Sequence, residues 1–251
     1  MRHSDRAMYE IHARSREHQR RIGEARRELE RVRGKRLVVG SSWGKDSVAL
    51  VDLAVRTLGP VDVVHLKSPY ELPGYESVLE WARGLGCTIH TAPTRKTLDG
   101  YLAWLDRVGL GFDWITGDAG KRSKIDELTE WITARGYEAR ATGVRAEESR
   151  QRAKHFAARG LTYTLTSGIV VTNPIGRWTG RDVWAYTVAR ELPWHPLYDC
   201  ETHGLTRERL RNAGWLTFHR SADSRASWLR QHYPEQWSIV VERWPHVRGR
   251  S

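Results

Sequence analysis

A chain of 251 residues, 39% hydrophobic and 28% charged, is long enough for one large domain or for one domain with additions at its ends. Two cysteines are too few for a disulfide scaffold or a four-cysteine metal or iron–sulfur site, so we expect no cluster and a reducing cytoplasm. No apolar run reaches the roughly 18–20 residues that span a bilayer, and we expect neither a membrane segment nor a secretory signal.

The net charge of +11 is concentrated at the two ends of the chain. Residues 1–36 carry a net +6 and residues 207–251 a net +5, while residues 37–206 are neutral. Basic ends around a neutral centre are typical of a catalytic body with additions that bind nucleic acid or another acidic partner. The alternative is an arginine-rich, solvated surface without a ligand.

The first predicted element is a basic N-terminal helix within residues 1–35. An apolar-biased stripe with alternating spacings of three and four residues predicts one continuous helix over residues 5–33. Ser15 and His18 interrupt this stripe near its centre, so a long coiled coil is not expected. The helix should lie across the body or pair with a second copy in a homodimer.

From residue 36 onward, short apolar segments alternate with segments of helical period. The predicted strands are 36–41, 61–66, 88–91, 138–144 and 161–171, the last with a possible interruption. The predicted helices are 46–58, 75–85, 97–108, 121–135 and 147–159. This alternation predicts an α/β fold with a parallel twisted sheet covered by helices on both faces, and ligands at the carboxyl ends of its strands. Residues 201–251 are predicted to form a basic, Trp-rich and mostly helical extension.

The sequence RLVVGSSWGKDSVALVDLAV (36–55) places a polar loop between the first of these strands and the first of these helices. The N-terminus of a helix offers free N–H groups to an anion, and Lys45 adds a positive charge beside them. A Walker A loop is excluded, because Gly40 precedes Gly44 by one residue too few and Asp46 replaces the hydroxyl residue that would hold magnesium. The loop is therefore predicted to bind phosphates in another way.

The stretch SWGKDS (42–47) resembles the S-G-G-x-D-S loop of the adenine-nucleotide alpha hydrolase (PP-loop ATP pyrophosphatase) superfamily, with Trp43 in place of the first glycine. Three later segments resemble its phosphoadenosine phosphosulfate reductase branch, in the same order. They are SPYELPGYESVLEWA (68–82), ATGVRAEESRQRA (141–153) and NPIGRWTGRDVWAYTVARELPWHPLYD (173–199). The resemblance covers about residues 36–200 and implies a PP-loop nucleotide-binding domain there.

The resemblance also implies which residues form the site. Lys45 and Asp46 are expected to be catalytic, with ATP or a related adenine nucleotide and Mg²⁺ as cofactors. The residues expected to bind the nucleotide are Ser41, Ser42, Gly44, Lys45, Asp46, Ser47, His65, Lys67, Gly143, Arg145 and Arg152. Two roles remain open for the arginines, since Arg145 and Arg152 can also form ion pairs with Glu147 and Glu148. The aromatic residues of segment 178–186 are expected to be core residues rather than catalytic ones.

The cysteines of this chain differ in position from those of the reductases that it resembles. Those reductases share a redox cysteine near the carboxyl terminus. This chain ends VERWPHVRGRS, so the usual thiol mechanism is not expected. Cys200 lies near His195 and His203, where an ordinary surface loop, a reactive thiol and a zinc site all remain possible readings. Cys87 is expected in the core.

Three functions are compatible with these observations. The first is cleavage of ATP between the α and β phosphates, which activates an acceptor by adenylation in nucleic-acid modification or sulfur transfer. The second is a phosphoadenosine phosphosulfate reductase, or a sulfonucleotide-binding enzyme, that uses an external thiol. The third is a non-catalytic nucleotide-binding accessory or assembly protein. Aromatic residues among the C-terminal arginines would suit stacking on nucleic-acid bases, or they pack the C-terminal helices. They are Trp215, Phe218, Trp228, Trp237 and Trp244.

Overall fold

The computed structural model describes residues 1, 3–67, 71–94, 97–108, 123–200, 206–210 and 228–245. The chain divides into two compact units. The first unit consists of Met1–Leu66, Tyr75–Ala92 and Leu128–His195, and the second of Lys67–Gly74, Pro93–Glu127 and Pro196–Ser251.

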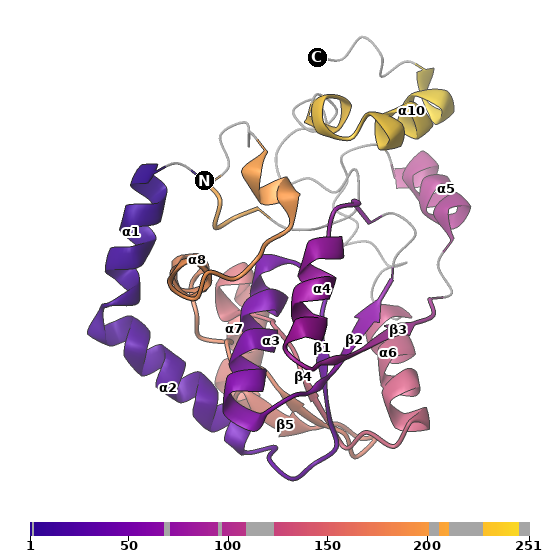
Figure 1. The fold of residues 1–251 in the computed structure, drawn as a ribbon. Helices are drawn as coiled ribbons and strands as arrows, with labels where there is room; N and C mark the ends of the chain where they lie inside the picture. Colours follow the sequence, from indigo (N-terminus) through magenta and orange to yellow (C-terminus); the bar gives the residue numbers. More distant parts are fainter. Residues whose placement is uncertain are drawn as a thin grey trace. The chain divides into compact units, whose positions relative to one another are not determined.

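A six-stranded sheet organises the first unit (Figure 1). Its order is β3-β2-β1-β4-β6-β5, and every neighbouring pair is parallel except β5 and β6. The strands are β1 Leu37–Gly40, β2 Asp62–Leu66, β3 Thr88–Ala92, β4 Ala139–Ala141, β5 Thr162–Thr164 and β6 Val170–Thr172. The predicted α/β class is confirmed. The predicted strand 161–171 is instead a hairpin of β5 and β6, which makes the sheet mixed rather than wholly parallel.

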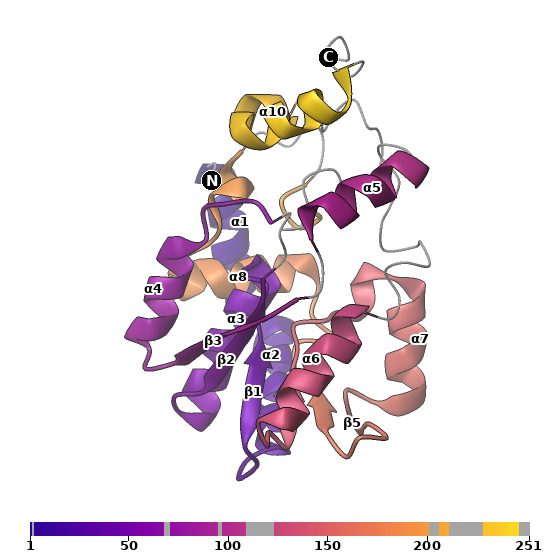
Figure 2. The ribbon, with the colours of Figure 1, turned by 90° about the vertical axis from the view of Figure 1, so that its right-hand side faces the viewer.

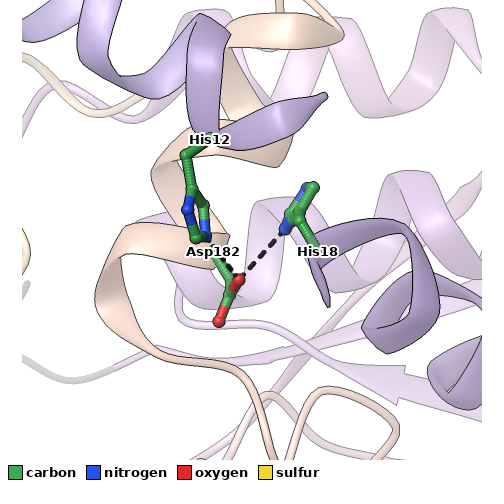
Figure 3. A group of neighbouring side chains, drawn as sticks. All are labelled: His12, His18 and Asp182. Carbon is green, nitrogen blue, oxygen red and sulfur yellow. Dashed lines mark hydrogen bonds and ion pairs between the residues drawn. The ribbon is translucent and has the colours of Figure 1, made fainter. Parts of the chain in front are cut away.

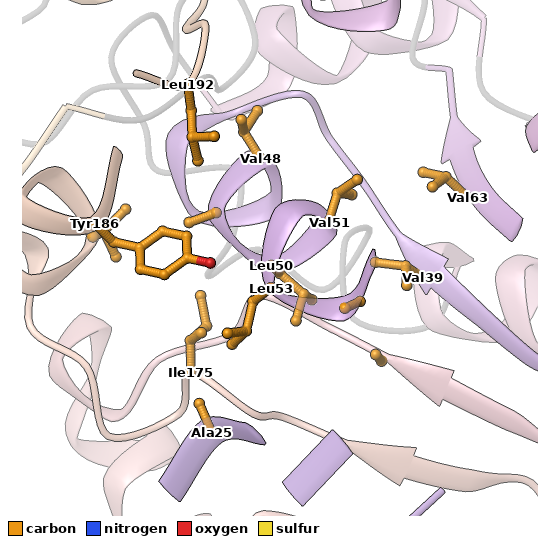
Figure 4. Close-up of a cluster of buried hydrophobic side chains, with 14 of the residues drawn as sticks. Ala25, Val39, Val48, Leu50, Val51, Leu53, Val63, Ile175, Tyr186 and Leu192 are labelled. Carbon is orange, nitrogen blue, oxygen red and sulfur yellow. The ribbon is translucent and has the colours of Figure 1, made fainter. Parts of the chain in front are cut away.

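Side chains alternate between the two faces of this sheet, and each face carries a cluster of buried hydrophobic residues. Val39 and Val63 belong to the core cluster on one face, and Val38 and Val64 to the cluster on the other. The first cluster includes side chains of α3 (Lys45–Leu58), α4 (Glu76–Gly84) and α8 (Gly180–Ala189). Part of this cluster, with residues of α3 and Tyr186 of α8, is drawn in Figure 4. The second is covered by α6 (Ser123–Ala134), which lies on the other side of the sheet from α3 and α4 (Figure 2).

The N-terminal segment forms two helices, α1 (His3–Ala13) and α2 (Arg16–Glu30), that meet at a bend (Figure 1). The prediction of one helix over residues 5–33 is therefore wrong. The Ser15 hydroxyl accepts a hydrogen bond from the His18 N–H (3.2 Å) and begins α2 as its N-cap, a role in which serine competes with helix continuation. Both helices pack on the first unit, with Tyr9 stacked near Trp184 and Leu29 fully buried.

The predicted helix 147–159 is also divided. A short 3₁₀ turn, η2 (Ala146–Glu148), precedes α7 (Arg150–Arg159), and the Ser149 hydroxyl caps α7 by accepting from the Arg152 N–H (3.2 Å). None of the α7 residues is buried.

The second unit contributes α5 (Leu98–Val108), η3 (Pro196–Asp199) and α10 (Pro234–Arg243) to the described part of the chain. Within it, Arg243 and the Trp244 indole both donate to the carboxylate of Asp106, the indole at 2.7 Å. Among all the described residues, no helix combines the length and the apolar character needed to cross a membrane.

Candidate functional site

The loop after β1 turns directly into the N-terminus of α3. The Ser41 N–H continues the sheet pairing by donating to Val64 O (2.9 Å), and the Ser41 hydroxyl accepts from the Trp43 N–H (3.1 Å). Gly44 is the N-cap and has no side chain to satisfy the N–H groups of the first turn. A helix N-terminus without a side-chain cap, at the carboxyl end of a parallel strand, is a site at which anions bind.

Trp43 holds an unusual position in this loop. Its backbone φ is +55°, in the left-handed region that glycine adopts at least cost, and its side chain is fully buried in the cluster beneath α3. The indole Nε1 is buried without a hydrogen-bond partner. The chain thus keeps the backbone shape that suits a glycine while placing a large aromatic anchor under the loop.

Asp46 lies between two cations at the start of α3. Lys45 Nζ donates to Asp46 Oδ2 (2.9 Å), and Arg145 Nε donates to Asp46 Oδ1 (2.6 Å). Burial alone would raise the pKa of Asp46, but the two cations outweigh it, and the net shift is downward. Asp46 is therefore a carboxylate at neutral pH, and the side chains of Lys45 and Arg145 are almost wholly buried beside it.

Arg145 is held on three sides. Besides Asp46, its guanidinium donates to Glu147 Oε2 (2.6 Å) and to Trp178 O (3.4 Å). Glu147 Oε2 also accepts from the Gly180 N–H (2.6 Å), at the first residue of α8. The expected ion pair between Arg145 and Glu147 is thus present, and Arg145 also contacts Asp46 at the end of the loop.

Gly143 brings the strand end of β4 against the loop. A Cβ atom at this position would lie 3.2 Å from the Asp46 carbonyl carbon and 3.3 Å from Ser47 N. Only glycine allows this approach without displacing one of the two backbones. The structure therefore places Gly143 against the backbone of the site, while its contact with a nucleotide stays a prediction.

The other predicted site residues lie in different settings. The buried His65 bonds through Nδ1 to Ser41 O (3.0 Å), and the Ser47 hydroxyl donates back to Gly44 O (2.9 Å), so both support the loop from within. Ser42 is exposed. Arg152, about a third exposed, pairs with Glu148. Lys67 is exposed and belongs to the second unit. Nucleotide contact by these five residues stays a prediction.

The two cysteines belong to different units. Cys87 is buried as expected, immediately before β3 and hence at the opposite end of the parallel sheet, and burial raises the pKa of its thiol. Cys200 belongs to the second unit, and its Sγ lies 3.7 Å from Pro196 O. His195 is fully buried, and His203 lies outside the described residues. The open readings of Cys200 remain untested.

A second polar cluster joins the N-terminal helices to α8, and sequence reasoning did not find it (Figure 3). Asp182 Oδ1 accepts from His12 Nε2 (2.8 Å) and His18 Nδ1 (3.1 Å), while Oδ2 accepts from Arg21 and from the Thr179 N–H and hydroxyl (both 2.7 Å). Burial would raise the pKa of Asp182, but these hydrogen bonds outweigh it and lower the pKa well below its usual range. Thr179 and Asp182 form a capping box, the one signal that was visible in the sequence.

The imidazole nitrogens and the carboxylate oxygen of this cluster lie within 4.8 Å of one another, close enough for three ligands of one metal ion. Arg21 already neutralises Asp182, however, and Asp182 lies in the first turn of α8, where the helix dipole is positive. A divalent ion would add two charges to a place that is already balanced, so a hydrogen-bonded junction is the better interpretation.

Several of the described charged and aromatic residues of the two ends are engaged within their own units. Arg20, Arg21 and Arg33 each pair with a glutamate one turn away on or next to α2. Trp228 and Trp244 are buried, and Trp237 is half-buried. Trp215 and Phe218 lie outside the described residues. Burial of Trp228 and Trp244 favours packing over base stacking for these two; nucleic-acid binding by the ends, and a homodimer, stay predictions.

The sheet is mostly parallel, and a loop of the kind that binds phosphates connects its central strand β1 to α3. These features define an α/β protein of the adenine-nucleotide alpha hydrolase class. Residues 36–207 match the model of the phosphoadenosine phosphosulfate reductase domain, and the chain belongs to that family. The resemblance found in the sequence is thereby confirmed.

Relatives agree with this assignment. A phosphoadenosine 5′-phosphosulfate reductase of Alkalilimnicola ehrlichii is 26% identical over 169 residues, which are 65% of this chain and 65% of that protein. Its counterpart in Gloeobacter violaceus is 26% identical over 176 residues, 68% of this chain and 69% of that protein. The chain thus spans about two thirds of the length of these relatives. A solved phosphoadenylyl-sulfate reductase from Candida auris, in a phosphate complex, is similar in fold, with a TM-score of 0.51 at 20% identity over 70% of this chain and 84% of that one.

Proposed function

We propose that the chain is an enzyme that binds an adenine nucleotide with its phosphate end over residues 41–47. The observation that carries the proposal is the arrangement of Lys45 and Arg145 around Asp46 at the N-terminus of α3, which has no side-chain cap. Backbone N–H groups and two cations in nearly water-free positions suit a polyanion, because fixed dipoles and charges act more strongly where water is excluded. Membership of the family supports nucleotide binding independently.

The first candidate reaction is cleavage of ATP between the α and β phosphates, with transfer of the adenylyl group to an acceptor. Negative charge develops on the departing pyrophosphate, and Lys45 together with the first N–H groups of α3 would stabilise it there. Asp46 is ionised and about a fifth exposed, but Lys45 and Arg145 already neutralise it, so it would hold Mg²⁺ only together with the negatively charged phosphates of a bound nucleotide. When bound, Mg²⁺ would supply further neutralisation of phosphate charge.

The second candidate is turnover of a sulfonucleotide, which the family and the names of its relatives favour. Reduction needs a nucleophilic thiol. Cys87 lies at the wrong end of the sheet with a raised pKa, so an external thiol, or one outside the first unit, would have to supply the electrons. The third alternative is an accessory or assembly protein that binds nucleotide without turnover. The experiment below distinguishes it from both reactions.

The test compares ATP, adenosine phosphosulfate and its 3′-phosphorylated form. Binding is measured by thermal shift and calorimetry, and turnover as pyrophosphate release from ATP or as sulfite release in the presence of a thiol donor. Pyrophosphate release would support the first candidate, and thiol-dependent sulfite release the second. Binding with neither product would indicate an accessory protein, and no binding of any of the three nucleotides would refute the proposal.

Variants connect the result to the loop. Lys45→Ala should keep the fold and lower turnover by about 10²- to 10³-fold, the usual effect of removing one group that stabilises transition-state charge. Asp46→Asn should also keep the fold and lower turnover, because the Asp46 carboxylate holds Lys45 and Arg145 in place. Lys35→Ala is the matched control, because Lys35 is exposed and precedes β1 at the opposite end of the sheet. If the loop variants bind and turn over nucleotide like the control, the loop is not the site.

A further inference from the structure

The segment Trp178–Asp182, which leads into α8, has the N-terminal helices on one side. The Trp178 indole Nε1 donates to Arg21 O (3.3 Å), and the Arg21 guanidinium donates to Asp182 Oδ2. His12 and His18 hold the other oxygen of the same carboxylate (Figure 3). Both α1 and α2 therefore hold this segment through hydrogen bonds between residues that are 157 to 170 positions apart in the sequence.

The same five residues meet the candidate nucleotide site on their other side. Trp178 O accepts from Arg145 Nη1 (3.4 Å), and the Gly180 N–H donates to Glu147 Oε2 (2.6 Å). Glu147 Oε2 in turn accepts from Arg145 Nη1 (2.6 Å). The guanidinium of Arg145 has three described hydrogen-bond partners. Trp178 O belongs to the segment itself, Glu147 is attached to the segment, and Asp46 is the third.

We infer that α1 and α2 position Arg145 over the phosphate loop, with Arg21 as the positioning residue and the Trp178–Asp182 segment as the connection. The inference deepens the proposed function and rests on it for its effect on nucleotide binding. It assigns a role to residues that precede the family-matched region, which begins at residue 36.

Burial makes the connection stiff enough to act. Trp178 is 1% exposed, Asp182 0% and Arg145 3%. Close-packed side chains cannot shift independently, so a change in how α2 holds the segment moves the groups that hold Arg145. Loss of the Arg21 guanidinium leaves Asp182 with its histidine and Thr179 partners, so the junction loosens without losing every contact.

The primary experiment replaces Arg21 by methionine, which keeps an unbranched apolar stem and removes the guanidinium. The matched control is Arg20→Met, because Arg20 lies on the same helix, is 62% exposed and pairs with Glu24. Dissociation constants for ATP and for phosphoadenosine phosphosulfate are measured by calorimetry, at a temperature where unfolding curves show every variant folded. Arg21→Met should weaken binding of the nucleotide that the parent binds by about 2- to 30-fold, and the control should not.

Two further variants separate positioning from stability alone. Arg21→Lys keeps a cation near Asp182 and should recover part of the affinity. In an Arg145→Gln background, Arg21→Met should have no further effect on affinity, because the residue through which it acts is already gone. A lower melting temperature with unchanged affinity in Arg21→Met would overturn the inference, and so would a full effect in the Arg145→Gln background.

A measurement without nucleotide keeps this inference separable from the proposed function. Hydrogen exchange is followed at the Gly180 N–H and at the Ala146 N–H, which donates to Gly176 O (2.8 Å). Faster exchange at both in Arg21→Met than in Arg20→Met supports the connection. Faster exchange at neither, or at Gly180 alone, overturns it. If the parent binds no adenine nucleotide, the proposed function fails, and the exchange result decides the connection by itself.

Discussion

Replacing Trp43 by glycine and, separately, by alanine should reveal the backbone strain under the phosphate loop. Both changes remove a fully buried indole, and a Trp→Ala change in a core costs about 3–5 kcal/mol of unfolding free energy. They differ at the backbone, because φ of +55° is costly for alanine and not for glycine. The left-handed conformation costs an L-residue about 1–2 kcal/mol, whereas glycine loses about 0.5–1 kcal/mol through its greater freedom when unfolded.

The glycine variant should therefore be more stable than the alanine variant by about 0.5–1 kcal/mol, the reverse of their order in an ordinary buried segment. The measurement is urea unfolding of both variants and of Trp43→Phe, followed by far-UV circular dichroism. Trp43→Phe keeps the strain but removes the unpartnered indole N–H, and should be the most stable of the three. An alanine variant as stable as the glycine variant would refute the account of strain.

Three other predictions concern separate parts of the first unit. Gly143→Ala should lower the unfolding free energy by about 1–3 kcal/mol in urea, and weaken nucleotide affinity, because its Cβ would displace the backbone at Asp46; unchanged affinity would contradict this. Asp182 has a lowered pKa, so its stabilisation is present above its ordinary value of 3.8 and is lost as pH falls through the lower folded value. The stability gap between the parent and Asp182→Asn should narrow in acid-unfolding curves below pH 3.8, and a gap that widens there would show the sign to be wrong. Burial and a hydrogen bond to Asp62 raise the pKa of Tyr137 to about 12, so its stabilisation is full below pH 10 and lost as pH rises through 12. Tyr137→Phe should flatten that alkaline loss in unfolding curves, and an unchanged slope would exclude Tyr137 as its source.

Charge substitutions test the polyanion hypothesis for the N-terminal segment better than a deletion of residues 1–33 would. Ile22, Ala25 and Leu29 of α2 lie in the core cluster beneath α3, so a deletion would expose the core along with removing charge. Substituting Arg26 and Arg31 by glutamine leaves those apolar contacts in place. A salt titration of binding to labelled DNA and RNA should then show a shallower slope than the parent if these residues contact phosphates, and parallel slopes would exclude such contact.

The loop and the central strands were predictable because their signals are local. A run such as 36–55 carries strand, turn and helix in consecutive residues, and the order of four motifs fixed the class of domain. The bend at Ser15 was not predicted, since the apolar stripe continues on both sides of it. Periodicity also carries no information about strand direction, so the antiparallel pairing of β5 with β6 did not appear in the pattern.

The Asp182 junction was invisible for a different reason. Its histidine and arginine partners lie 161 to 170 residues away, and no spacing rule connects them. Each residue has an ordinary explanation by itself, Asp182 as part of a capping box and Arg21 as one of several arginines on a basic helix. Only the packing of α1 and α2 against the start of α8 brings them together.

That packing has a consequence for how the chain is made. On a ribosome that adds about 5–20 residues per second, the N-terminal helix emerges about 10–30 s before the part of α8 that receives it, because His12 and Asp182 are 170 residues apart. During that interval Tyr9 lacks its partner Trp184, and the nascent α1 is open to chaperones or to premature association. We expect synonymous changes that slow translation between residues 30 and 180 to lower the soluble yield without altering the finished protein.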